Sequence, residues 1–119
     1  MKAMVQWLLV GDLAEGKAAE LRELMSEMVA GTKANEPGAL IYEWYLNEAE
    51  SRLELLERYA DNAAAMTHLA NFGKNYASRF TPLFASLTFH VHGAPGDDFR
   101  AALTPFGPAY FAEIGGFVR

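Results

Sequence analysis

Three side chains near the middle of the sequence have the chemistry needed for proton transfer. Glu57 and Tyr59 are two residues apart in an apolar stretch, and His68 follows shortly after them. A carboxylate on an apolar strand face requires a partner or a shifted pKa. A histidine beside such a carboxylate can act as a general base at neutral pH. We therefore expect Glu57 and His68 to handle protons and Tyr59 to position a substrate.

A structural alternative stands beside this catalytic hypothesis. In the alternative, His68 is partly exposed on the flank of a helix, and Glu57 pairs with a tyrosine or an arginine only for stability. The two hypotheses differ in whether the two side chains meet inside a cavity.

A predicted hairpin positions Glu57 and Tyr59. Residues 39–47 and 52–60 are rich in β-branched and aromatic side chains, and the polar turn 48–51 separates them. The register expected for this loop pairs Leu46 with Leu53, Trp44 with Leu55, Tyr42 with Glu57 and Leu40 with Tyr59. One hairpin face is then apolar and aromatic apart from Glu57. The other face is mixed, which suits partial exposure or a subunit contact.

His68 falls in a predicted helix that would cover the apolar face. Asp61 is a suitable N-cap and Gly73 a suitable end for this helix. His68 lies beside the apolar stripe formed by Ala65, Leu69 and Phe72. We therefore expect the helix to bring the imidazole to the sheet.

Four further elements complete the predicted fold. Strands are expected over residues 3–10 and 84–92 and helices over 14–30 and 74–80, with Gly11, Asp12 and Gly31 as stops. The order strand, helix, strand, strand, helix, strand predicts a ferredoxin-like α+β domain with an antiparallel four-stranded sheet and helices on one face. We assign residues 1–92 to this domain.

Residues 93–119 form an apolar extension that prolines and glycines interrupt. Asp97 or Asp98 is expected to cap a short helix within it. Such a segment must pack somewhere, so we expect it on an edge or open face of its own subunit or on a partner.

Aromatic residues are a second group of candidate site residues. An organic ligand is usually held by aromatic side chains with a few polar groups among them. The simpler explanation is that such residues fill the core. The candidate substrate-binding residues are Trp7, Tyr42, Trp44, Phe72 and Tyr76.

Composition narrows the possible partners and compartment. The net charge of -5 gives no electrostatic reason to expect nucleic acid, and 51% hydrophobic residues support one folded core. The absence of cysteine excludes disulfides and thiol catalysis. No run approaches the roughly 20 apolar residues that span a bilayer, so we expect a cytoplasmic protein without a membrane partner. His90 and His92 share a strand face, but two ligands are too few to predict a metal site.

Several residues, in this element order, resemble the antibiotic biosynthesis monooxygenase family of small α+β barrel-forming proteins. They are Glu36-Pro37-Gly38, Tyr42-Glu43, Glu57-Arg58, Ala60-Asp61 and His68-Leu69. The resemblance covers roughly residues 3–92. It implies a homodimer, a dimeric α+β barrel, with a pocket between sheet and helices in each subunit. It also implies oxygenation of an aromatic or quinol-like substrate by molecular oxygen with no cofactor, because a deprotonated, electron-rich substrate can react with oxygen itself.

The same resemblance leaves other activities open. In the haem-degrading branch a histidine ligates iron where this chain has Ser78, and a tryptophan stands at His68, so we expect no haem. A non-catalytic ligand-binding or structural dimer is one alternative. A cofactor-free isomerase of small carbonyl compounds is another, and oxygen dependence distinguishes it from an oxygenase.

Overall fold

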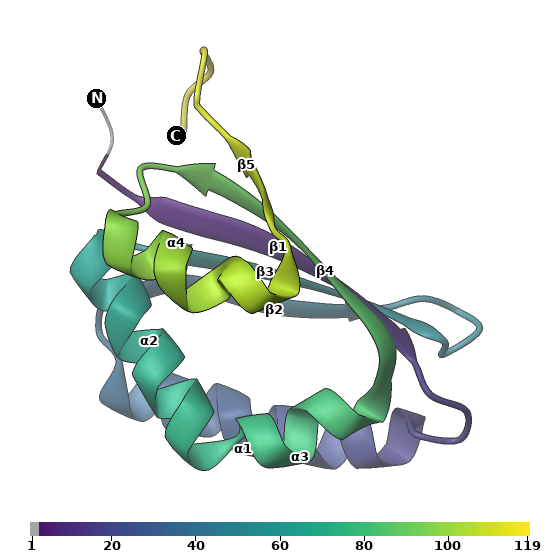
Figure 1. Ribbon diagram of the computed structural model, residues 1–119. Helices are drawn as coiled ribbons and strands as arrows, with labels where there is room; N and C mark the ends of the chain where they lie inside the picture. Colours follow the sequence, from purple (N-terminus) through teal and green to yellow (C-terminus); the bar gives the residue numbers. More distant parts are fainter. Residues whose placement is uncertain (1–2) are drawn as a thin grey trace.

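The protein consists of a single five-stranded sheet with helices packed on one of its faces (Figure 1). The computed structural model describes residues 3–119. The strand order is β2-β3-β1-β4-β5, and β1 to β4 pair with one another in antiparallel fashion. The elements are β1 (Val5–Leu13), α1 (Ala18–Asn35), β2 (Ala39–Leu46), β3 (Arg52–Tyr59), α2 (Asn62–Asn75), α3 (Ala77–Phe80), η1 (Thr81–Leu83), β4 (Phe84–Gly93), α4 (Asp97–Leu103), η2 (Thr104–Phe106) and β5 (Ala109–Phe111).

The predicted ferredoxin-like α+β fold is confirmed, with one added strand. The four-stranded sheet is extended by β5, which pairs in parallel with β4 along His90, Val91 and His92. Gly107 adopts a left-handed φ of 58° that lets the chain turn back toward this edge. A three-residue strand carries too little alternation to be read from sequence.

The hairpin register is confirmed on the part that positions the site. Leu46 pairs with Leu53, Trp44 with Leu55 and Tyr42 with Glu57. The predicted pair of Leu40 with Tyr59 is wrong, because the register shifts between Ala39 and Ile41 and Ala39 pairs with Tyr59 instead. Such a shift leaves a residue without a partner, and Leu40 is 58% exposed.

The glycines predicted as stops do not end their elements. β1 continues through Gly11 and Asp12, which pair with β3 and β4. α1 passes Gly31 because the missing side chain makes room for a neighbour: an added Cβ would lie 2.3 Å from the Tyr76 hydroxyl. Gly73 likewise lies within α2. At these positions a glycine therefore marks a close approach of a neighbouring residue, or simply fits within the helix or strand, and does not end it.

The core lies between the sheet and the helices. β1 turns Val5, Trp7 and Leu9 inward, as its alternation predicted. Facing them is the buried stripe of α1, formed by Leu21, Leu24, Met28 and Thr32. Asp61 caps α2 as expected, since its side chain accepts a hydrogen bond from the Ala64 N–H at 2.8 Å.

The start of the C-terminal extension also joins the core. Phe99 and Leu103 of α4 are buried. The N-cap of α4 is Gly96 rather than Asp97 or Asp98, which lie in its first turn. Within the described part of the chain, the helices are too short or too polar to cross a bilayer.

Candidate active site

Glu57 and His68 meet in the interior, as predicted. His68 Nε2 lies 3.2 Å from Glu57 Oε1. The same carboxylate accepts a hydrogen bond from Tyr59 OH at 2.8 Å and one from Trp7 Nε1 at 2.6 Å. All four side chains are buried. Successive side chains of a strand point to opposite faces of the sheet, so Trp7 of β1 and Glu57 and Tyr59 of β3 share one face. Helix α2 packs on that face and brings His68 into contact with them.

A second buried carboxylate, Glu36, completes the cluster. Glu36 Oε1 lies 2.9 Å from His68 Nδ1, and Asn71 Nδ2 donates to Glu36 Oε2 at 3.2 Å. Sequence reasoning missed Glu36 because it lies in a predicted loop before Pro37-Gly38. It is the C-cap of α1, and only the packing of α1 against α2 brings it to the imidazole.

His68 is positively charged at neutral pH. Both ring nitrogens face carboxylate oxygens, and ionised carboxylates only accept hydrogen bonds, so this arrangement favours a proton on each nitrogen. Burial alone would lower the pKa of His68, but the hydrogen bonds and charges of Glu36 and Glu57 raise it to about 9. His68 therefore begins as a proton donor, which differs from the free base expected from sequence.

The other members of the cluster keep the charge states that this imidazolium requires. Burial would raise the pKa of Glu36, but the His68 hydrogen bond and charge, with Asn71, hold it below its ordinary value. Burial, and then the charge of Glu57, raise the pKa of Tyr59. Tyr59 is thus a neutral hydrogen-bond donor to Glu57 and not a base.

An apolar cavity of about 250 Å³ opens beside the cluster. Glu57 and His68 reach its wall, and the remainder is mostly aliphatic and aromatic. The lining residues are Trp7, Leu9, Met28, Tyr42, Leu55, Glu57, His68, Leu69, Phe72, Gly73, Phe80, Thr81, Leu87, Phe89, Ala102, Leu103 and Phe106. An organic molecule bound there would meet an acid and a carboxylate on an otherwise apolar surface.

The cavity includes some of the predicted binding residues and omits others. Trp7, Tyr42 and Phe72 line it. Trp44 instead borders a hollow beside α1, and Tyr76 lies in a small polar pocket with Glu36 and Asn71. Tyr59 stands behind the wall, stacked on Trp7 with ring centroids 4.8 Å apart.

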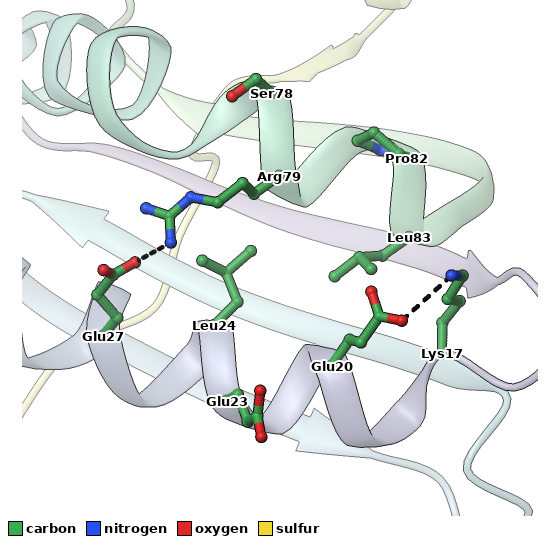
Figure 2. A pocket seen from close by; sticks show the side chains of 9 residues that line it. All are labelled: Lys17, Glu20, Glu23, Leu24, Glu27, Ser78, Arg79, Pro82 and Leu83. Carbon is green, nitrogen blue, oxygen red and sulfur yellow. Dashed lines mark hydrogen bonds and ion pairs between the residues drawn. The ribbon is translucent and has the colours of Figure 1, made fainter.

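A larger groove of about 490 Å³ lies on the surface between α1 and α3 (Figure 2). Four of its charged side chains form two pairs, with Arg79 2.7 Å from Glu27 across the groove and Lys17 3.2 Å from Glu20 at the start of α1. These pairs are about half exposed, so water competes for their charges. The smaller inner cavity, with its buried charged groups, is therefore the candidate site.

The outer sheet face carries His90 and His92. Both rings lie against Phe111, and His92 Nδ1 is 3.1 Å from Gln6 Nε2. Among residues 3–119, histidines and carboxylates do not gather in threes in a way that would hold a metal ion.

Comparison with known families assigns the chain to one of them. The model of the family described as antibiotic biosynthesis monooxygenase matches residues 12–73. The chain belongs to this family. The match spans the hairpin and most of α2, and therefore Glu36, Glu57 and His68. No curated protein sequence matches the chain.

Solved structures share the fold of this family member. MupZ from Pseudomonas fluorescens superposes with a TM-score of 0.82 at 22% identity, over 100% of this chain and 91% of that one. A candidate antibiotic biosynthesis monooxygenase from Caulobacter crescentus CB15 gives 0.68 at 26% identity, over 76% and 88%. Rv0793 from Mycobacterium tuberculosis gives 0.66 at 25% identity, over 79% and 96%.

Proposed function

We propose that this protein is a cofactor-independent monooxygenase that binds a small aromatic or quinol-like molecule in the inner cavity and oxidises it with molecular oxygen. The observation that carries the proposal is the buried Glu36–His68–Glu57 cluster at the wall of an apolar cavity. Family membership supports a small-molecule oxygenase. The cluster can accept and donate protons, and a cofactor-independent oxygenation requires the protein to remove a proton from the substrate.

Glu57 is the proposed proton acceptor. A carboxylate offers about four acceptor positions, and Trp7, Tyr59 and His68 occupy three of them. The fourth remains for an acidic C–H or O–H of the substrate. The resulting anion is electron-rich enough to reduce oxygen directly, so the protein's task is to form and hold that anion.

His68 is the proposed proton donor and electrostatic partner. Its positive charge beside the cavity stabilises the substrate anion, and its Nε2 proton can pass to the oxygen that leaves. For a reactive methylene the balance is CH₂ + O₂ → C=O + H₂O. One oxygen atom enters the product, and the other leaves as water with the two hydrogens. Glu57 returns its proton to His68, so the cluster ends as it began.

Oxygen consumption with a panel of one-ring and two-ring quinols tests the proposal. We expect uptake with at least one member, one O₂ per product, and a strong loss in Glu57→Gln and His68→Ala. Uptake that both variants leave unchanged would show that the assigned residues are not the catalytic ones.

A cofactor-free isomerase is the second candidate. The observation that favours it is that the cluster contains both an acid, His68, and a base, Glu57. Such a pair can move a proton between two carbon atoms of a carbonyl compound without oxygen. Turnover of small enolisable ketones under strict anaerobiosis would select this activity. A reaction that stops without oxygen would select the monooxygenase.

We also propose that the protein works as a homodimer. Apolar side chains on the extension and on edge strand β2 are exposed in the single chain, among them Ile114, Phe117, Val118, Leu40 and Tyr45. A second copy would cover such surface. Light scattering at micromolar concentration is expected to give twice the chain mass of 13.1 kDa, and a monomer would contradict this.

A further inference from the structure

The C-terminal extension builds one wall of the cavity. Ala102 and Leu103 of α4 and Phe106 of η2 line the space that Glu57 and His68 reach. These residues lie outside the stretch 12–73 that the family model matches. Figure 1 shows α4 on the same side of the sheet as α2. The cavity is therefore partly shaped by a segment that the family pattern does not specify.

Two contacts hold the beginning of this wall in place. Phe99 is fully buried with its ring centroid 5.4 Å from that of Trp7, the donor to Glu57. The Asn62 side chain accepts from the Gly96 N–H at 2.7 Å and donates to Asp98 at 2.8 Å. These bonds tie the start of α4 to the start of α2.

Phe106, at the far end of the wall, is held more loosely. It is 43% exposed although it lines the cavity, so its side chain contacts both the ligand space and solvent. Its ring centroid lies 5.4 Å from that of Phe89, another lining residue. Gly107 follows in a left-handed conformation, and a Cβ added there would meet no atom within 4 Å. Phe106 thus stands at the boundary between cavity and water, beside an uncrowded turn.

We propose that Phe106 sets the upper size limit of the ligand, admitting aromatic molecules of one or two fused rings and excluding three. A cavity of roughly 150 Å³ is enough to bind benzene, so about 250 Å³ leaves space for a second fused ring. A third ring would exceed this volume and meet the Phe106 side chain at the edge of the cavity. This inference rests on the proposed function, because it assumes that the inner cavity is the ligand site.

Equilibrium dialysis with 1-naphthol and 9-phenanthrol tests the limit without requiring turnover. The native chain is expected to bind 1-naphthol at least about tenfold more tightly than 9-phenanthrol, the scale on which apolar pockets discriminate. Phe106→Ala is expected to tighten 9-phenanthrol binding by a similar factor. Phe106→Trp is expected to weaken the binding of 1-naphthol.

Phe111→Ala is the matched control. Phe111 belongs to the same extension and is 49% exposed, but it lies against His90 and His92 on the other face and does not line the cavity. We expect it to change neither affinity. A thermal melt of each variant confirms that it is folded.

The outcomes separate this inference from the proposed function. Equal affinity of the native chain for both probes, or a Phe106→Ala variant that matches Phe111→Ala, would overturn the size limit while leaving the oxygenase proposal intact. A native chain that binds neither probe would overturn the size limit, and oxygen uptake on the quinol panel would then decide the oxygenase proposal by itself. Selective binding without oxygen uptake on any quinol would leave the size limit standing and remove the oxygenase.

Discussion

The inner cluster and the surface groove contain the same kinds of charged side chain in opposite surroundings. In the groove, Glu27 pairs with Arg79 at 2.7 Å, and both side chains are about half exposed (Figure 2). In the interior, Glu36 and His68 are paired at 2.9 Å with about 5% of each side chain exposed. The distances are nearly equal, and in the interior pair the partner's charge raises the pKa of His68 and lowers that of Glu36 against the effect of burial. Burial rather than contact distance makes a charged pair chemically useful, because water screens the exposed one.

The largest expected effect is on activity in Glu57→Gln. The amide keeps the shape of the side chain but cannot accept a substrate proton. We expect the oxygen-consumption rate to fall by about 10²- to 10⁴-fold, the usual contribution of a positioned base. Glu27→Gln is the matched control in the groove and should retain the native rate. An equal loss in both variants would show that the comparison between the two regions is wrong.

The next effect is on the pH dependence of stability. A histidine with a raised pKa stabilises the fold fully below its unfolded value of 6.5, and this stabilisation disappears as the pH rises through about 9. The shift corresponds to about 3 kcal/mol in the free energy of unfolding. Urea unfolding at pH 6 and pH 9.5 measures the difference. His68→Gln should remove most of it, and a native protein equally stable at both pH values would contradict the charged imidazole.

Glu36→Gln separates the two carboxylates around His68. The substitution removes one negative charge and leaves an amide that can still accept from Nδ1, so the pKa of His68 should fall below 9. We expect a loss of roughly 2 kcal/mol in the free energy of unfolding, the scale for weakening a buried charged hydrogen bond. The imidazole carbon shifts of His68 in an NMR titration report the pKa. An unchanged titration would remove Glu36 from the cluster.

The smallest effect is expected in the groove itself. Arg79→Ala removes the partner of Glu27, but both side chains are already hydrated. We expect a change within about 1 kcal/mol that shrinks further in high salt. Thermal unfolding at low and high salt measures it. A loss as large as that of Glu36→Gln would show that exposure does not separate the two regions.

The sequence predicted more of the sheet than of the helix ends. Alternation in residues 39–47 and 52–60 was enough to place Tyr42 opposite Glu57, because a period of two fixes which side chains share a face. The helix ends were wrong at Gly31 and Gly73 because a glycine within a helix costs little when packing supports it. Gly31 is accounted for by the Tyr76 hydroxyl, a contact between α1 and the end of α2 that no local pattern contains.

Only those residues of the candidate site that belong to regular, patterned elements were predicted from the sequence. Glu57 was recognisable as a carboxylate on an apolar strand face, and His68 as a member of the covering helix. Glu36 and Phe106 were not recognisable, since one ends a helix and the other lies in an irregular extension. Trp44 and Tyr76 were expected in the pocket on residue type alone, and packing directs them to other hollows.

By itself, the sequence determined the α+β element order, the hairpin register around Glu57 and the family. These depend on local periodicity and on residues close together in the chain. Only the tertiary structure decided that His68 lies between two carboxylates and that the C-terminal extension lines the cavity, since the Glu36–His68 and Asn62–Asp98 contacts join residues 32 and 36 positions apart. The charge on His68 belongs to this second group, because a pKa is set by whatever surrounds the group in space.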